Sequence, residues 1–278
     1  MRGKGEAYWG VYPYLEIGGI RVATHDLFSV LALLVGFAIY YRDLRIRRLL
    51  EPRIVFISLC ALVGGAIGAR LLLAWEHLDF YAQYLGSAPI TWVIENGGKS
   101  LIGAIVGGWV AILIAKRALR YPRSTGDSYA FALPIGVAIG RIGCFLSELP
   151  LGKPTDLPWG VRVDPAAAAA FPYCPGCDLP MHPTMVYEIA FNVVAVLVLW
   201  RVRRRFVVNG DLIRAYLLAA AVFRFAVEFI RTSPPQLLGL TAPQLVLIPI
   251  LVYLTMHFAR RWRSGTYKLP AAPVASTA

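Results

Sequence analysis

The sequence has few charged residues. They make up 16% of its 278 positions, while apolar types make up 58%, whereas soluble globular chains average about a quarter charged residues. This balance argues against a soluble domain. The N-terminal stretch MRGKGEAYWGVYPYLEIGG also lacks a basic segment followed by an apolar core and a small-residue cleavage site. We therefore expect no cleavable signal peptide, and the first apolar segment would itself direct insertion.

Other absences narrow the range of functions. We find no internal repeat and no glycine-rich loop of the nucleotide-binding type. The formal net charge of +12 could suit a nucleic-acid-binding protein. The basic residues, however, sit in short clusters between apolar runs, which is the pattern of cytoplasmic loops in membrane proteins. We therefore expect the lipid bilayer, and no nucleic acid, as a partner.

Long apolar runs are what the sequence has in abundance. A helix needs about 20 predominantly apolar residues to cross the bilayer core. Runs of that kind lie at 23–41, 54–75, 99–115, 128–147, 184–200, 211–230 and 242–259. We predict an all-α polytopic membrane protein with about seven transmembrane helices. The third run is rich in glycine, so it could also enter as a broken or re-entrant segment, covered by protein or by a water-filled cavity.

The loops alternate in charge and predict an orientation. Basic residues cluster at every second connection and in the tail, at 42–53, 116–123, 201–205 and 260–268. The intervening loops are poor in basic residues and hold acidic ones. Because positive loops stay in the cytoplasm, we expect the N-terminus outside and the C-terminus inside.

The domain organisation follows from these segments. We predict a single transmembrane domain over 1–262, including an extracytoplasmic loop at 148–183, and a disordered cytoplasmic tail over 263–278. The loop is dense in proline and glycine, which argues against long helices. Its alanine run at 166–170 would be one short helical turn or simple filler.

The four cysteines are unevenly spread. Cys60 and Cys144 lie in apolar runs, while Cys174 and Cys177 share the outer loop. A short-range disulfide between the last two is the plain interpretation in an oxidising compartment. Metal binding there would need two more ligands and only His182 is close in sequence, so we expect no metal site.

Arg141 is an ionisable residue inside the fourth apolar run. Such a residue costs roughly 2.5–3.5 kcal/mol on insertion scales and marks a functional site by default. Gly136, Gly140 and Gly143 surround it, and glycines allow backbone or a ligand to approach closely. A guanidinium forks onto phosphate oxygens, so we favour an anionic lipid headgroup as its partner. A structural ion pair with a distant carboxylate is the alternative.

Two further helix regions carry ionisable residues. The sixth run holds Arg224, Glu228 and Arg231; Arg224 and Glu228 are four apart and could pair with each other. Arginines on separate helices still predict a cationic pocket suited to a lipid phosphate. At the start of the fifth run, His182 is either a hydrogen-bonding anchor or a proton acceptor for an extracytoplasmic substrate.

Several motifs in order resemble those of the prolipoprotein diacylglyceryl transferase family. The resemblance covers about 17–255 and rests on Asp127, LPIGVAIGRIG around Arg141, Gly152, GGKS with later glycines at 97–108, HPTMVYE at 182–188, RFAVEFIR at 224–231, and LGLTAPQ ending at Gln244. It implies a bacterial cytoplasmic (inner) membrane enzyme. That enzyme would transfer diacylglyceryl from phosphatidylglycerol to the lipobox cysteine of a prolipoprotein, on the outer side.

The resemblance and the embedded charges together give a predicted site. The catalytic candidates are Arg224, His182, Glu228 and His25. The substrate-binding candidates are Arg141, Gly140, Gly143, Arg231, Tyr187 and Glu188. We expect no cofactor. The expected partners are phosphatidylglycerol, lipobox peptides of prolipoproteins and the bilayer.

The chain departs from the family's pattern at several positions. The family's third-span histidine falls at Ile102 and its first-span tyrosine at His25. Its sixth-span tyrosine falls at Ala220, and its asparagine and glutamate after Arg141 fall at Cys144 and Leu149. An isoleucine cannot accept a proton. The base would then be His25 (next to Asp26), His182 or Glu148, or the chain would be a paralogue with another acceptor or without catalysis.

The sequence is also compatible with two other classes of function. A non-catalytic or transporter-like lipid-binding protein would hold phosphatidylglycerol through Arg141 and Arg224 without turning it over. A membrane thiol oxidoreductase would use Cys174 and Cys177 together with Cys60 or Cys144, although no partner motif supports a redox-active dithiol.

Overall fold

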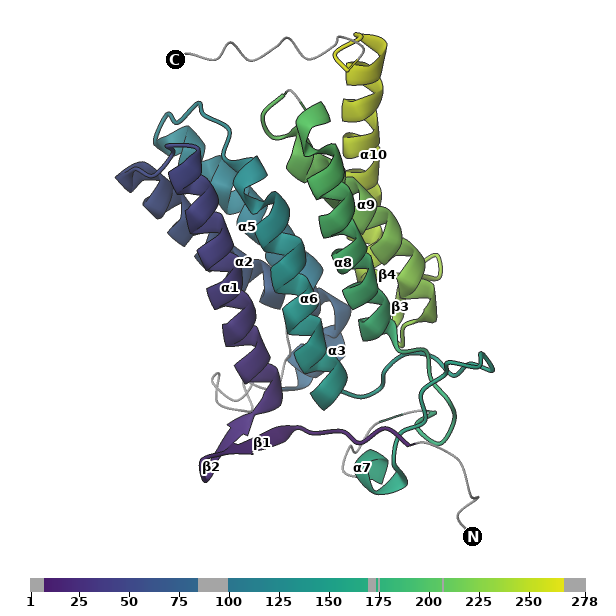
Figure 1. The fold of residues 1–278 in the computed structure, drawn as a ribbon. Helices are drawn as coiled ribbons and strands as arrows, with labels where there is room; N and C mark the ends of the chain where they lie inside the picture. The colour runs from purple at the N-terminus through teal and green to yellow at the C-terminus, as the bar shows by residue number, and fades with distance from the viewer. Residues whose placement is uncertain (1–7, 85–99, 170–173, 175, 207, 268–278) are drawn as a thin grey trace. The chain divides into compact units, whose positions relative to one another are not determined.

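The structure is a computed structural model that describes residues 8–84, 100–169, 174, 176–206 and 208–267. Long helices dominate this part of the chain (Figure 1), which confirms the all-α prediction. Six of the described helical segments are long and apolar enough to cross a membrane, with mean hydropathies from 1.6 to 2.1. The chain is therefore a multi-pass membrane protein.

The helices coincide with the predicted spans. They are α1 (Thr24–Ile46), α2 (Pro52–Glu76), α5 (Leu101–Ala118), α6 (Tyr129–Ser147), α8 (Thr184–Val202), α9 (Asp211–Val227) and α10 (Ala242–Arg263). Helix α9 is not among the six; with the turn η3 (Glu228–Ile230) it covers the predicted 211–230, which carries Asp211, Arg214, Arg224 and Glu228. The count of seven and the orientation stay predictions.

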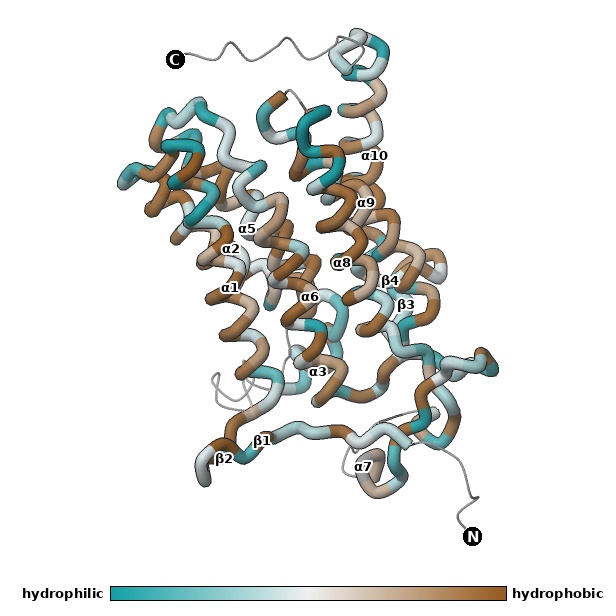
Figure 2. The backbone as a smooth tube through the Cα atoms, in the orientation of Figure 1, coloured by the Kyte–Doolittle hydropathy of each residue, from teal (hydrophilic) through white to brown (hydrophobic). Residues whose placement is uncertain are grey.

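Large apolar side chains point away from the protein along these helices. On α1, Leu33, Leu34 and Phe37 are 61%, 62% and 60% exposed. On α8, Leu197 and Val198 are also exposed, and Figure 2 shows hydrophobic residues along the length of the helices. Exposed apolar area of this extent marks a surface for lipid or another apolar partner.

The chain divides into two compact units, which we describe separately. The first comprises 1–43, 125–232 and 251–278. It begins with a hairpin of β1 (Tyr14–Ile17) and β2 (Ile20–Ala23), paired antiparallel. Gly18 and Gly19 both have positive φ, +58° and +80°, which a two-residue type I′ hairpin turn requires.

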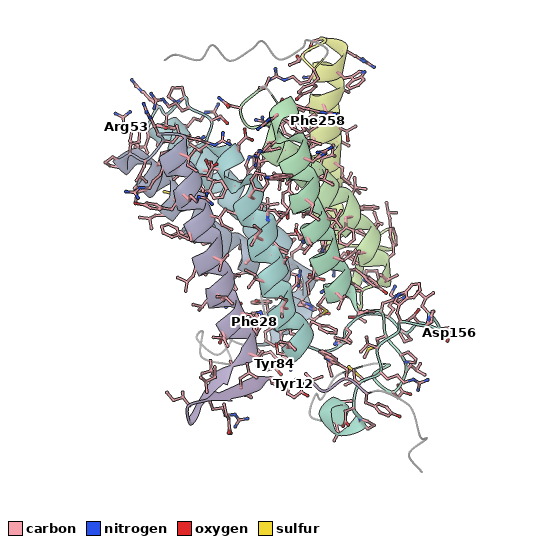
Figure 3. The ribbon with its side chains drawn as sticks, in the orientation of Figure 1. Tyr12, Phe28, Arg53, Tyr84, Asp156 and Phe258 are labelled. Carbon is pink, nitrogen blue, oxygen red and sulfur yellow. A yellow bond between two sulfur atoms is a disulfide. The ribbon has the colours of Figure 1, made fainter. Side chains whose placement is uncertain are left out.

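Helix α6 is the centre of the first unit and packs beside α8 (Figure 1). It also packs against α1: a Cβ added at Gly143 would lie 2.5 Å from Cβ of Phe28. Phe28, labelled in Figure 3, lies near the start of α1. Glycine at 143 is therefore required by helix packing.

Buried hydrogen bonds connect α6 to α9 through the turn η1 (Gly126–Ser128), which precedes α6. The Asp127 carboxylate accepts from the backbone N–H of Gly210 (2.7 Å) and of Ile213 (3.1 Å). These N–H groups belong to the first turn of α9, where helices leave donors without intrahelical acceptors. Asp127, quoted for its resemblance to the family, thus caps a helix.

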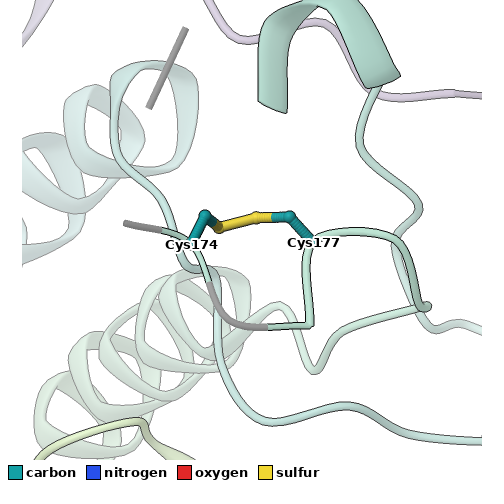
Figure 4. Close-up of a disulfide and its surroundings, with 2 residues drawn as sticks. All are labelled: Cys174 and Cys177. Carbon is teal, nitrogen blue, oxygen red and sulfur yellow. A yellow bond between two sulfur atoms is a disulfide. The ribbon is translucent and has the colours of Figure 1, made fainter. Parts of the chain in front are cut away.

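The 148–183 loop folds without long helices in its described residues, as predicted. Its one helical turn, α7 (Pro165–Ala169), begins where Asp164 accepts from the N–H of Ala166 (2.8 Å). Figure 4 shows the Cys174–Cys177 disulfide, which confirms the prediction for this pair. The loop is fixed to α8 by the hydroxyl of Thr184, which donates to the carbonyl of Leu151 (2.6 Å).

The second unit comprises 44–124 and 233–250 and is built on α2 and α5. The two helices cross closely: a Cβ added at Gly68 would lie 2.8 Å from Cα of Gly107. The α5 helix is unbroken from Leu101 to Ala118, so its glycines serve packing, and the re-entrant alternative is wrong for these residues. Ser100 caps it by accepting from Gly103 N (3.4 Å), while positions 97–99 of the GGKS motif lie outside the described residues.

The remaining elements of the second unit are short. They are α3 (Leu78–Tyr84), β3 (Pro235–Leu237), β4 (Leu240–Thr241) and the first turns of α10. Strands β3 and β4 pair antiparallel. Gln244, at the end of the LGLTAPQ motif, is buried and accepts from the backbone N–H of Thr241 (3.0 Å).

The C-terminal end of α10 belongs to the first unit and packs at the start of α9. His257 Nε2 lies 2.8 Å from Asp211 Oδ1, and the Tyr267 hydroxyl donates to Asp211 Oδ2 (2.5 Å). Burial and this bond to Asp211 raise the pKa of Tyr267, which remains a donor at neutral pH. Positions 268–278 of the predicted tail lie outside the described residues. The short turn η2 (Arg203–Arg205) follows α8 and precedes α9 in the chain.

Candidate functional site

Glu188 joins three arginines from separate parts of the chain. It lies one turn into α8 and its side chain is 4% exposed. Its Oε2 is paired with Arg141 Nε from α6, and its Oε1 lies 3.4 Å from Arg224 Nη1 and 3.6 Å from Arg231 Nη1. Three of the predicted residues are thus brought together by a fourth.

Glu228 is the second carboxylate of this cluster. Its Oε2 lies 2.7 Å from Arg224 Nη2 and 4.0 Å from Arg231 Nε, and its side chain is fully buried. The pair of Arg224 and Glu228 that the sequence left open is therefore formed. Arg141, for its part, forms an ion pair with a carboxylate of another helix, which is the structural alternative to anion binding considered from the sequence.

Local hydrogen bonds position Glu188. The Asn192 side chain donates to the backbone carbonyl of Glu188 (2.7 Å) and accepts from the Tyr216 hydroxyl (2.8 Å). Both polar side chains are buried, so this chain of bonds fixes the start of α8 against α9. The sequence analysis missed Asn192 and Tyr216. Asn192 could have been noticed, because it is a polar residue in an apolar run, one turn after Glu188.

The cluster retains a net positive charge. Three guanidiniums face two carboxylates, which leaves one formal positive charge among the five side chains. Each guanidinium has five N–H donors, more than the two carboxylates can accept. One phosphodiester would neutralise the excess charge and could accept from the remaining donors.

A second polar cluster adjoins the first at Arg141. Arg141 Nη1 donates to Cys144 Sγ (3.7 Å), one turn along α6. Beyond it, His25 Nε2 from α1 lies 3.3 Å from Glu148 Oε1, at the end of α6. His25 Nδ1 lies 3.4 Å from Asp26 Oδ1. Arg141 therefore touches both the arginine cluster and the cluster around His25.

The start of α8 carries a third group of polar side chains. His182 Nδ1 lies 3.3 Å from the Tyr187 hydroxyl, which also accepts from Trp159 Nε1 (2.9 Å). Trp159 comes from the loop 148–183 and was not singled out by the sequence. His182 is thus held as a hydrogen-bonding partner of Tyr187.

Residues 13–260 of this chain match the family model of the prolipoprotein diacylglyceryl transferases. The chain belongs to that family. Three relatives are named phosphatidylglycerol–prolipoprotein diacylglyceryl transferase: those of Pseudomonas putida (33% identical, 86% of this chain and 89% of the relative), Thermosynechococcus vestitus (31%, 84% and 85%) and Bordetella bronchiseptica (31%, 83% and 87%). The enzyme is accordingly a transferase.

The departures from the diacylglyceryl transferase pattern can now be placed. His25 and Cys144, at the family's tyrosine and asparagine positions, lie in one cluster with Glu148. Ile102 is buried on α5 in the second unit. The structure thus gathers two substituted positions and a neighbouring carboxylate in the transferase at one place.

The two glycines of the predicted site differ in their surroundings. Gly143 packs against Phe28, whereas a Cβ at Gly140 would meet only Cβ of Ala32, at 4.0 Å. Both contacts are with α1, and neither is with a charged side chain. Their role as substrate-binding residues of the transferase stays a prediction, and helix packing accounts for Gly143.

Proposed function

We propose that this chain transfers the diacylglyceryl group of phosphatidylglycerol to the lipobox cysteine of prolipoproteins, at the outer side of the bacterial cytoplasmic membrane. The observation that carries the proposal is the cluster of Arg141, Arg224 and Arg231 around Glu188 and Glu228, which holds one excess positive charge. A phospholipid phosphate supplies the matching negative charge, while its acyl tails remain in the bilayer.

The reaction is an S-alkylation. The acceptor thiol loses its proton, and the thiolate sulfur forms a bond to the glyceryl carbon that carries the phosphate ester. The carbon–oxygen bond to phosphate breaks, and glycerol phosphate leaves with the electron pair and one additional negative charge. Because charge develops on the phosphate oxygens, preorganised cations lower the barrier. Arg141 and Arg224 fit this role; Glu228 holds Arg224, and Arg231 binds the same two carboxylates as Arg224.

The position of the site within the first unit supports an outward-facing active site. The loop 148–183 leaves the end of α6 and enters the start of α8, beside Glu148 and Glu188. The opposite end of α8 carries the basic turn Arg203–Arg205, which by the positive-inside rule is cytoplasmic. A secreted prolipoprotein would then reach the site from outside.

The acceptor thiol has a place next to the lipid phosphate. The cluster of His25, Cys144 and Glu148 is linked to the arginines by Arg141. The His25 side chain is 36% exposed and that of Glu148 is 42% exposed, so a peptide could approach them. We assign His182 and Tyr187 to shaping the entrance with Trp159.

A turnover assay tests the proposal. Purified protein is incubated with phosphatidylglycerol and a lipobox peptide, and the peptide mass is measured. We expect a diacylglyceryl adduct, with a rate lowered roughly 100-fold or more in Arg141→Gln because a charged contact to the leaving phosphate is lost. Arg203→Gln, in the basic turn η2, is the matched control and should keep the wild-type rate. An unchanged rate in Arg141→Gln would contradict the role of the cluster.

A non-catalytic lipid-binding paralogue is the second candidate, because Ile102 stands where the family has a histidine. It predicts that phosphatidylglycerol copurifies and that Arg141→Gln releases it, while no peptide adduct forms with any variant. A thiol oxidoreductase instead requires the Cys174–Cys177 disulfide for activity. Transfer activity that survives in Cys174→Ser would exclude it.

A further inference from the structure

The cluster around His25 contains three side chains of metal-binding type. His25 from α1, with Cys144 and Glu148 from the end of α6, offers one nitrogen, one sulfur and one oxygen. These three donor atoms all lie within 4.8 Å of one another. Donors about 2.0–2.3 Å from a tetrahedral zinc ion lie about 3.3–3.8 Å apart. Movements on the order of 1 Å would therefore complete the geometry.

The groups behind these donors fit a metal site as well. His25 Nδ1 lies 3.4 Å from Asp26 Oδ1, and Nε2 is the nitrogen that faces Glu148, at 3.3 Å from its Oε1. Histidines that ligate a metal through one nitrogen commonly donate from the other to a carboxylate. Arg141 Nη1 donates to Cys144 Sγ (3.7 Å), which is the bond that would stabilise a ligating thiolate.

The site is also partly open. Cys144 is buried, whereas the side chains of His25 and Glu148 are 36% and 42% exposed. Three protein ligands and an accessible fourth position are the arrangement of catalytic zinc. On its other side, Arg141 is paired with Glu188 in the arginine cluster. A ligand in the fourth position would therefore lie near the lipid phosphate.

We propose that His25, Cys144 and Glu148 bind a divalent zinc-type cation whose fourth ligand is the thiol of the acceptor peptide. The inference rests on the proposed transferase function and supplies what that function lacks, since Ile102 cannot accept a proton. A thiol that coordinates such a cation is deprotonated. The chain would thereby replace a general base by a metal ion, using residues at which it departs from the family's pattern.

The acceptor thiol would react while it is bound to the cation. On binding, the acceptor thiol gives its proton to water and its sulfur coordinates the cation. The metal-bound sulfur forms the bond to the glyceryl carbon, and the carbon–oxygen bond to phosphate breaks. Glycerol phosphate leaves with the electron pair, held by Arg141 and Arg224. The thioether product is neutral and a weaker ligand, so it dissociates from the cation.

Metal content is the first test. Full-length protein, purified with zinc and freed of excess metal, should retain about one zinc per chain. The zinc content should fall at least tenfold in Cys144→Ala and in His25→Ala. The matched controls, Cys60→Ser and His77→Ala, should keep the wild-type zinc content. Cys144→Asn, with the family's residue, should fold and still lose it. Zinc content that is equal in Cys144→Ala and wild type would overturn the proposal.

Cobalt substitution tests the fourth ligand. Co²⁺ bound by Cys144 should give one thiolate charge-transfer band in the near ultraviolet. A lipobox peptide, added without phosphatidylglycerol, should increase this band about twofold because a second thiolate coordinates. The same peptide with serine in place of cysteine should leave it unchanged. An identical absorbance with both peptides would refute coordination of the acceptor.

The turnover assay separates this inference from the proposed function. Adduct formation that is abolished by chelation and restored by zinc supports both. Adduct formation by metal-free protein overturns the inference alone and assigns proton removal to the His25–Glu148 pair. Metal binding without any adduct overturns the transferase function and removes the catalytic role of the metal with it.

Discussion

Glu188 is the residue on which the arrangement of the arginines depends. Ionisable residues in apolar runs are expensive, so the sequence alone singled out Arg141, Arg224, Glu228, Arg231 and Glu188. It could not show which would pair, because Glu188 contacts arginines 36 to 47 positions away. Those contacts depend on how α6, α8 and α9 pack, which local sequence does not encode.

We predict that Glu188→Gln destabilises the protein. Removal of one charge from a buried ion pair leaves uncompensated charge and costs about 3–5 kcal/mol. The unfolding midpoint in detergent should fall by several degrees, as measured by differential scanning fluorimetry. Glu16→Gln, in the exposed hairpin, is the control and should leave the midpoint unchanged. An unaltered midpoint in Glu188→Gln would show that the arginines do not need this carboxylate.

Arg224→Lys should be nearly as damaging as Arg224→Gln. The guanidinium reaches Glu188 with Nη1 and Glu228 with Nη2, and a lysine cannot form this fork. We expect kcat to fall roughly 100-fold, because the orientation of the cation toward the leaving phosphate is lost. Steady-state kinetics of peptide modification would measure it. A lysine variant with wild-type kcat would mean that only the charge matters.

At the scale of the helix, the positions of the spans were predictable and their crossings were not. Apolar runs of sufficient length located α1, α2, α5, α6, α8 and α10. The glycines of the third run suggested a broken segment, but Gly107 instead meets Gly68 where α5 crosses α2. Glycine in an apolar helix allows both irregular backbone and close packing, and only the partner helix decides between them.

Gly143 and Gly140 provide a matched test on α6. An alanine Cβ at 143 would meet Phe28 at 2.5 Å, while one at 140 would have only Ala32 in contact. We expect Gly143→Ala to lower the unfolding midpoint. Gly140→Ala should leave the midpoint equal or raise it slightly, since alanine favours a helix over glycine by up to about 1 kcal/mol. Equal destabilisation by both would argue against the packing of α1 on α6.

At the scale of the whole molecule, the sequence predicts the membrane orientation, whereas the cluster of possible metal ligands emerges only from the structure. Loop charges predicted the orientation without a structure. The cluster of His25, Cys144 and Glu148 needed the fold, because the sequence separates His25 from Cys144 by more than a hundred positions. The sequence marked Cys144 as a substitution for the family's asparagine and as a cysteine that a thiol oxidoreductase could use, and not as a metal ligand.

Cysteine labelling tests the orientation. Asp156→Cys lies in the loop 148–183, and Ser264→Cys follows α10; both positions are exposed. A membrane-impermeant thiol reagent should label Asp156→Cys on intact spheroplasts and Ser264→Cys only after permeabilisation, each compared with the unsubstituted chain. The reverse pattern would place the active site on the cytoplasmic side.

The most direct test of the central claim is the fate of an isotope-labelled lipid. Phosphatidylglycerol with ¹³C in its diacylglycerol moiety is incubated with the purified protein and a lipobox peptide, and the products are analysed by mass spectrometry. Our account predicts a peptide that carries the labelled diacylglyceryl group on its cysteine, together with unlabelled glycerol phosphate. A peptide of unchanged mass, or one that carries the phosphoglycerol headgroup, would contradict it.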